Sequence, residues 1–212
     1  MPLRLAALCG LLVPLTFIVG LVAGDLVQPE AFSPADDNIS DLGALTASSP
    51  WLYNQVASNL TGLLILGLAL GLWRALRSGV LARLGVLTLV VVGVGRFLEG
   101  FLRLDCQGID VGCENDSWHS SAHRVESGIV AAATFVAPLL LAFAFRRLPA
   151  WRRLWLPTLL AVPATLAASV VFSLVGNGAS TRAGTIVWLL WLGLVGFWLL
   201  RISDRHSRRP PP

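Results

Sequence analysis

Residues 84–102 read LGVLTLVVVGVGRFLEGFL, and Arg96 and Glu99 are the only charged residues in this run. The hydrocarbon core of a bilayer is about 30 Å thick, and a helix rising 1.5 Å per residue needs about 20 residues to cross it. Apolar residues here are continuous rather than alternating, and only helices and closed barrels satisfy all their backbone groups in lipid. The run therefore predicts a transmembrane helix.

Five further apolar runs of similar length lie on either side of this one, at residues 5–24, 52–73, 120–145, 154–175 and 184–200. The chain of 212 residues is 55% hydrophobic and 13% charged, about half the charged fraction typical of a soluble domain. We therefore predict an all-α fold, a polytopic integral membrane bundle of about six transmembrane helices. It forms a single domain over residues 1–202, followed by a disordered cytoplasmic tail over residues 203–212.

The distribution of charge predicts how these helices are oriented. All 16 basic residues are arginine, and cytoplasmic loops of membrane proteins are enriched in arginine and lysine. Twelve arginines fall at one side of the predicted bundle: Arg4, Arg74, Arg77, Arg83, Arg146, Arg147, Arg152, Arg153, Arg201, Arg205, Arg208 and Arg209. Nine acidic residues fall at the other side: Asp25, Glu30, Asp36, Asp37, Asp41, Asp105, Asp110, Glu114 and Asp116. Both patterns predict that the N- and C-termini are cytoplasmic.

The same distribution argues against nucleic-acid binding, although the formal net charge is +4. A nucleic-acid interface needs a basic stripe or patch, commonly with interleaved aromatic residues. The arginines instead lie in short clusters between apolar runs. The partner that this pattern predicts is the lipid bilayer.

Cys106 and Cys113 both lie in a predicted outer loop over about residues 103–119. Compartments outside the cytoplasm are oxidising, so a disulfide that closes this loop is expected. The alternative is a pair of metal ligands, which the acidic neighbours of the two cysteines would suit.

Polar residues inside the predicted helices gather in the outer half of the bilayer. The inner half is almost entirely Leu, Val, Ala and Gly. Because a charge facing lipid costs several kcal/mol at mid-depth, these side chains should face one another or water. They predict a polar cavity open to the outside, and the residues are Asn54, Gln55, Ser58, Asn59, Thr61, Arg96, Glu99, Arg103, His119, His123, Arg124, Glu126, Ser169, Ser173, Thr181, Arg182 and Thr185.

One part of this set has the spacing of a metal site. His119 and His123 are four residues apart on one helix, and two such histidines can both reach a single Zn²⁺. A further ligand would come from Asp41 or Asp105. A zinc ion with an open position lowers the pKa of its bound water. Hydrolysis would then use a carboxylate as general base, here Glu126 or Glu99.

A structural interpretation of the same residues stays open. HxxxH without a glutamate between the histidines is a weak motif, and here the intervening residues are Ser120, Ser121 and Ala122. His123 and Glu126 could instead pair with arginines across the bundle. The polar cluster would then bind a ligand or hold the outer loops together, and its members are Ser40, Asp41, Asn54, Arg96, Arg103, Asp105 and Arg124.

Several motifs resemble a known family. Ile39-Ser40-Asp41-Leu42-Gly43 follows the first apolar run, and Trp51 and Asn54 open the second. Phe101-Leu102-Arg103-Leu104-Asp105 precedes a Gly-containing loop, and His123 follows that loop. Over about residues 5–200 this arrangement resembles the bacterial six-helix membrane proteins grouped as domain of unknown function 998.

The resemblance implies a six-helix topology and a location in the bacterial plasma membrane, and it highlights Ser40, Asp41, Asp105 and His123. It implies no reaction, because the function of the family is not established. Cys106, Cys113 and His119 depart from the family pattern.

Two functional hypotheses follow. In the first, the protein binds a lipid or other ligand in the polar cavity, or serves as an accessory subunit of a larger membrane complex. In the alternative, it is a metal-assisted hydrolase that acts on a lipid or envelope precursor at the outer leaflet. A transporter is less well supported, since the inner half offers no polar path.

Overall fold

The computed structural model describes residues 1–76 and 79–207 and is helical throughout its regular structure. The elements are α1 (Leu3–Leu26), η1 (Ile39–Gly43), η2 (Leu52–Leu60), α2 (Thr61–Ala75), α3 (Val80–Glu99), α4 (Trp118–Arg147), η3 (Arg152–Leu154), α5 (Trp155–Ser173) and α6 (Asn177–Ser207). Six helices are long and apolar enough to cross a membrane, with η2 and α2 forming one continuous span over Leu52–Ala75. The predicted all-α bundle of six transmembrane helices is confirmed, and the chain is a multi-pass membrane protein.

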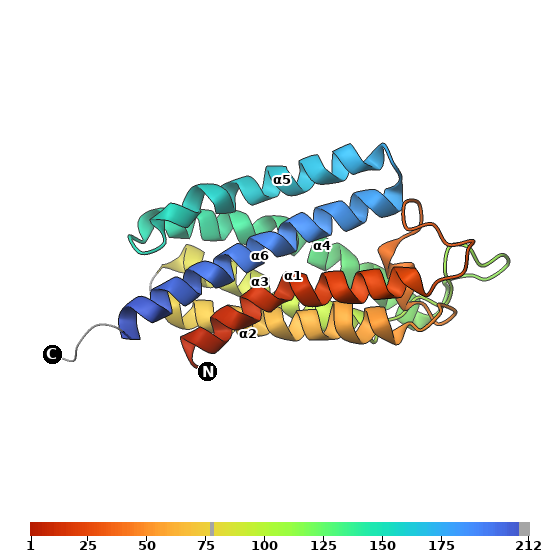
Figure 1. The fold of residues 1–212 in the computed structure, drawn as a ribbon, viewed down its shortest axis with the longest axis horizontal. Coiled ribbons are helices and arrows are strands. Elements are labelled where there is room, and N and C mark those ends of the chain that lie inside the picture. Colours follow the sequence, from red (N-terminus) through yellow and green to blue (C-terminus); the bar gives the residue numbers. More distant parts are fainter. Residues whose placement is uncertain (77–78, 208–212) are drawn as a thin grey trace.

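The six spans form a closed ring. Each span packs against the next one along the chain, and α1 packs against α6 to complete the circle. In Figure 1 the helices run side by side along the long axis of the molecule. The N-terminus and the last turns of α6 lie at one end, and the long connections lie at the other.

These two ends carry different charges. We call the end with the N-terminus, Arg74, Arg83 and the α4–α5 connection the arginine-rich end, and the end with residues 27–51 and 100–117 the acidic end. The separation of charge agrees with the pattern used to predict orientation, and a cytoplasmic arginine-rich end stays a prediction. Arg77, Arg208 and Arg209 lie outside the described residues. Helix α6 continues to Ser207, so it enters the predicted tail over residues 203–212, and residues 208–212 lie outside the described part.

The second span begins as a π-helix, η2, before it continues as the α-helix α2. The hydroxyl of Thr61 lies 3.4 Å from the carbonyl of Val56, five residues earlier. Tyr53, Asn54 and Ala57 form part of its buried face. π-Helical turns are rare overall but occur often at functional sites. Here the wide turns direct polar side chains into the bundle.

Glycines allow neighbouring helices to pack with their backbones in contact. A Cβ atom built on Gly62 of α2 would lie 2.5 Å from the backbone nitrogen of Phe97 in α3. Gly10 of α1 and Gly196 of α6 face each other, and a Cβ on either would lie 2.8 Å from the other's Cα. Small residues at such crossings are a common packing device in membranes, where close van der Waals contact replaces the hydrophobic effect between helices.

We predict that Gly62→Ala lowers the thermal stability of the detergent-solubilised protein. The new methyl group would meet backbone atoms that cannot move aside, and overpacking of this kind costs about 1–3 kcal/mol. Gly128→Ala is the matched control, because no atom lies within 4 Å of a Cβ built on Gly128. Tryptophan fluorescence during heating measures both variants, and equal melting temperatures would contradict the close α2–α3 approach.

Candidate functional site

A cavity of about 400 Å³ lies inside the ring, toward the acidic end, and is lined by η1, α3, α4, α5 and α6. Its charged and ionisable lining residues are Arg96 and Glu99 from α3 and His123 and Glu126 from α4. The hydroxyl residues that line it are Ser40, Ser127, Thr134, Thr165, Ser169, Ser180, Thr181 and Thr185. Apolar lining comes mainly from Ile39, Val130, Ala131 and Phe135. The cavity therefore combines a charged region with hydroxyl-lined and apolar walls.

The last turns of α3 place a compact ion pair at the cavity. The Nη1 atom of Arg96 lies 2.5 Å from Oε2 of Glu99, three residues later on the same face. The hydroxyl of Tyr53, from η2, donates to Oε1 of Glu99 over 2.8 Å. The guanidinium of Arg96 also lies 5.3 Å from the ring centroid of Phe17 in α1. Both carboxylate oxygens of Glu99 are thus used within the protein, as a buried charge requires.

Ser117 caps the start of helix α4 and so fixes how deep in the bundle its polar residues lie. The Ser117 hydroxyl accepts a hydrogen bond from the backbone N–H of Ser120, the usual role of an N-cap serine. One turn farther, Nδ1 of His123 lies 2.8 Å from the carbonyl oxygen of Leu102. A carbonyl can only accept, so Nδ1 carries the proton and Nε2 is left as an acceptor in the neutral ring. Nε2 lies 3.5 Å from the hydroxyl of Ser127.

Two buried polar groups at the cavity are weakly satisfied. Glu126 is 9% exposed. Within the described residues its carboxylate accepts one hydrogen bond, from the hydroxyl of Ser127 over 3.4 Å. Thr165 of α5 is 6% exposed, and its hydroxyl has no hydrogen-bond partner among the described residues. The Thr165 hydroxyl oxygen has less than 1 Å² of accessible surface, so it is enclosed by the protein and is not open to the cavity.

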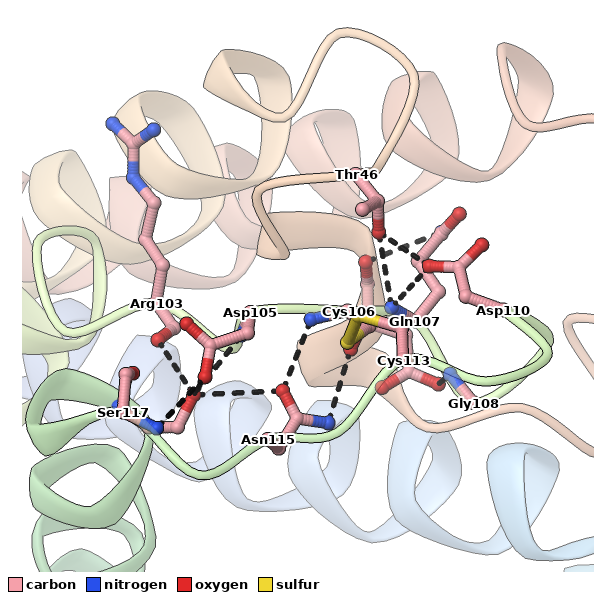
Figure 2. The surroundings of a disulfide bond; sticks show 12 residues. Thr46, Arg103, Asp105, Cys106, Gln107, Gly108, Asp110, Cys113, Asn115 and Ser117 are labelled. Atoms are coloured by element: carbon pink, nitrogen blue, oxygen red, sulfur yellow. Dashed lines mark hydrogen bonds between the residues drawn. A yellow bond between two sulfur atoms is a disulfide. The ribbon is translucent and has the colours of Figure 1, made fainter.

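The loop between α3 and α4 covers η1 at the acidic end, as Figure 2 shows. A disulfide joins Cys106 to Cys113, with Cα atoms 6.1 Å apart, which confirms the disulfide-closed loop. The Asn115 side chain bonds both backbone groups of Cys106, accepting from its N–H at 3.0 Å and donating to its carbonyl at 3.2 Å. Thr46 donates to Asp110 across the loops. The result is a small rigid loop rather than a mobile connection.

This loop holds η1 through Asp41. The backbone N–H of Gly108 donates to Oδ2 of Asp41 over 3.2 Å, and the Gln107 side chain donates to the carbonyl of Asp41 over 3.2 Å. Burial raises the pKa of Asp41, and the hydrogen bond from Gly108 opposes that rise. From the other side, the Asn54 side chain donates to the carbonyl of Gly43, the last residue of η1, over 3.0 Å. The Ser-Asp-Leu-Gly segment is therefore clamped between the loop and η2.

Asp105 and His119 form a second cluster at the start of α4. Desolvation raises the pKa of Asp105, but hydrogen bonds from Ser117 and Ser120, together with the nearby His119, lower it below its ordinary value. His119 places Nε2 at 3.4 Å from Asp105 and Nδ1 at 2.8 Å from the carbonyl of Arg103. The side chain of Arg103 points away from this cluster in Figure 2, so it contributes its backbone rather than its charge.

The family described as protein of unknown function (DUF998) matches residues 11–198, nearly the whole chain. The chain belongs to the DUF998 family. No curated protein and no solved structure matches it. The resemblance to this family predicted from the sequence is thereby confirmed, and it assigns no activity.

In this DUF998 chain, the predicted site residues separate into two groups. Ser40, Arg96, Glu99, His123 and Glu126 all line the cavity. Ser169, Thr181 and Thr185, also predicted, line it as well. The other predicted polar residues do not line it, and these are Asp41, Asn54, Gln55, Ser58, Asn59, Thr61, Arg103, Asp105, His119, Arg124, Ser173 and Arg182. Among them, Arg124 donates to the carbonyl of Asn115 and to Ser121 at the exposed surface of α4.

This separation bears on the predicted zinc site. Within the described residues, no three His, Cys, Asp or Glu side chains are arranged to hold a metal ion together. His119 lies beside Asp105 outside the cavity, His123 lines the cavity, and Asp41 is bound to the disulfide loop. The ligand set expected from sequence is therefore not assembled.

Several polar residues at the site were not predicted, among them Tyr53, Ser127 and Thr165. Tyr53 is the single tyrosine of the chain and lies at the beginning of the second apolar run. Thr165 shares a helical face with Thr158 and Ser169, at intervals of seven and four residues within an otherwise apolar run. That spacing was the available signal for a polar face on α5.

We predict that Asp41→Asn raises the melting temperature at pH 7. The folded-state pKa of Asp41 lies above its unfolded value of about 3.9, so its favourable contribution is present at low pH and is lost as the pH rises through the folded pKa. At pH 7 the buried carboxylate therefore opposes folding. An asparagine stays neutral and can still accept from Gly108.

The melting temperature, measured between pH 4 and pH 8, checks this prediction. The gain from Asp41→Asn should shrink as the pH falls toward 4. Asp116→Asn, at an exposed loop position, is the control and should leave the profile unchanged. A lower melting temperature for Asp41→Asn at pH 7 would show that the charge itself stabilises η1.

Proposed function

We propose that this protein binds the polar part of an amphiphilic ligand, a membrane lipid, in the outer half of a bacterial plasma membrane. The observation that carries the proposal is a ligand-sized cavity, lined by both charged and apolar residues, within the membrane-spanning part of the chain. Ionisable residues at membrane depth are costly and mark ligand or ion sites by default.

The size and depth of the cavity suit a head group rather than a whole lipid. A volume of about 400 Å³ falls in the lower range of small-molecule sites. On α4 the lining extends from His123 to Phe135, a distance of about 18 Å along the helix axis. Charged residues lie toward the acidic end of that path, and Val130, Ala131 and Phe135 lie deeper. A molecule with one polar and one apolar end matches this gradient.

The ligand would reach the cavity from the bilayer, between α4 and α5. Helix α5 is the least covered of the six spans, with 22% of its most apolar window buried. It packs more extensively on α6 than on α4. Ala131 of α4 lines the cavity and is also exposed, which supports an opening at this seam. Acyl chains would then remain in the bilayer while the head group enters.

The other functions considered from sequence have less support. Metal-assisted hydrolysis would need His119, His123 and a carboxylate to converge, and they lie in two separate clusters. An accessory-subunit role would not require a ligand-sized polar cavity within the membrane-spanning part of the chain. Binding of a ligand accounts for that cavity.

We predict that Ala131→Phe weakens lipid binding in the cavity about tenfold. The new ring would fill the α4–α5 seam, and Ala131 is exposed enough for the substitution to be tolerated. Ala132→Phe is the matched control, since Ala132 is the next residue, is also exposed and does not line the cavity. Lipid retained by the purified protein, quantified by mass spectrometry, should fall about tenfold, corresponding to about 1.4 kcal/mol, for Ala131→Phe only.

Crosslinking with a photoactivatable phospholipid locates the bound molecule. Labelled peptides from residues 123–135 and 165–185 of the wild type, reduced in Ala131→Phe, are the expected result. Equal lipid retention and equal labelling in both variants would refute the proposal.

A further inference from the structure

The charges at the cavity do not cancel. Arg96 and Glu99 form an ion pair at 2.5 Å, with side chains 13% and 8% exposed. The hydroxyl of Tyr53 donates to the second carboxylate oxygen of Glu99, and the ring of Phe17 lies against the guanidinium of Arg96. This cluster is satisfied by α1, η2 and α3 without any ligand. The remaining ionisable acid at the cavity is Glu126.

Glu126 is buried without an ion-pair partner of its own. Arg96 is committed to Glu99, and no ion pair to Glu126 lies within 4.0 Å in the described part of the chain. On its other flank Glu126 borders an apolar groove between α3 and α4, formed largely by Val94, Leu98, Val125 and Ile129. A buried carboxylate is strongly disfavoured unless a cation or several hydrogen-bond donors satisfy it.

The groups near Glu126 in the cavity can accept hydrogen bonds. In the neutral ring, Nε2 of His123 is an acceptor because Nδ1 donates to the carbonyl of Leu102. The Ser127 hydroxyl lies within 3.5 Å of both His123 and Glu126. A ligand that supplies several N–H donors and one positive charge would satisfy all of these groups.

We infer that the head group bound in this cavity is a primary ammonium, held by the carboxylate of Glu126 and by acceptors of His123 and Ser127. The inference rests on the proposed function, because it names the chemistry of the ligand at that same site. A primary ammonium carries three donors and one charge, which matches the acceptor set and the uncompensated acid. A quaternary ammonium brings the charge without donors, and an anionic head group brings the wrong charge.

Three phospholipids with identical acyl chains separate these possibilities: phosphatidylethanolamine, phosphatidylcholine and phosphatidylglycerol. They differ in having a primary ammonium, a quaternary ammonium and no amine. Binding to the full-length protein in nanodiscs or mild detergent is measured by native mass spectrometry with pairwise competition. We expect phosphatidylethanolamine to be preferred about tenfold over each of the others, equivalent to about 1.4 kcal/mol.

Glu126→Gln should remove this preference while lipid binding as such persists. The amide has nearly the same shape as the carboxylate and lacks its charge, so the cavity is retained. Glu114→Gln is the control, because Glu114 is an exposed acid in the disulfide loop and should leave the preference unchanged. The melting temperatures of both variants verify folding. Soluble glycerophosphoethanolamine, which has the amine but no acyl chains, tests the source of the ligand.

The outcomes distinguish this inference from the proposed function. Equal binding of the three lipids, or a preference that survives Glu126→Gln, overturns the ammonium assignment. If that binding is still weakened in Ala131→Phe, the cavity remains a lipid site. Binding that Ala131→Phe does not affect overturns both. If glycerophosphoethanolamine competes at the same concentration as the lipid, the site recognises the ammonium group. The ligand would then be a soluble amine and not a membrane lipid.

Discussion

Lipid cannot solvate a charge or an unpaired backbone group, and this constraint organises the membrane-spanning part of the molecule. Arg96 lies three residues from Glu99 on α3, and Tyr53 of η2 and Phe17 of α1 complete its surroundings. Arg182 of α6 is satisfied in the same way by Asp25 of α1, at 2.7 Å, and by the carbonyl of Asp37. Each arginine connects elements distant in sequence, so the polar groups that lipid excludes also determine which helices are neighbours.

The acidic end adds a second, water-facing layer to this arrangement. The disulfide loop binds Asp41, Asn54 binds Gly43, and η1 between them contributes Ile39 and Ser40 to the cavity wall. The Ser-Asp-Leu-Gly segment thus has a structural role as a roof over the cavity. Glu126, which accepts one 3.4 Å hydrogen bond among the described residues, lies in the cavity beneath this roof. Such a group costs free energy in the empty protein and is the natural point of contact for a ligand.

The spans could be predicted from the sequence because continuous apolar length is a one-dimensional signal. The run at 120–145 corresponds to α4 (Trp118–Arg147), and the run at 84–102 to α3 (Val80–Glu99) with its end shifted by three residues. The polar cavity was also predictable, since Arg96, Glu99, His123 and Glu126 lie at one depth. His119 and His123 share one face of α4, but His119 lies beside Asp105 in the α3–α4 loop, whereas His123 lies one turn deeper and lines the cavity. The spacing alone could not show that the loop would occupy His119, and this is why the predicted metal ligands do not converge. The π-helical start of the second span, which turns Tyr53 toward Glu99, likewise leaves no periodic signal in the sequence.

The packing of α1 against α6 has a consequence for how the protein is made. Of the six spans, α1 packs against both the second span and α6, and Asp25 meets Arg182 only after 157 further residues have been added. Until then the Gly10 face of α1 and the carboxylate of Asp25 lack their final neighbours. The ring therefore closes after synthesis of the last span, and the insertion machinery or surrounding lipid must accommodate an open, five-helix intermediate during biogenesis.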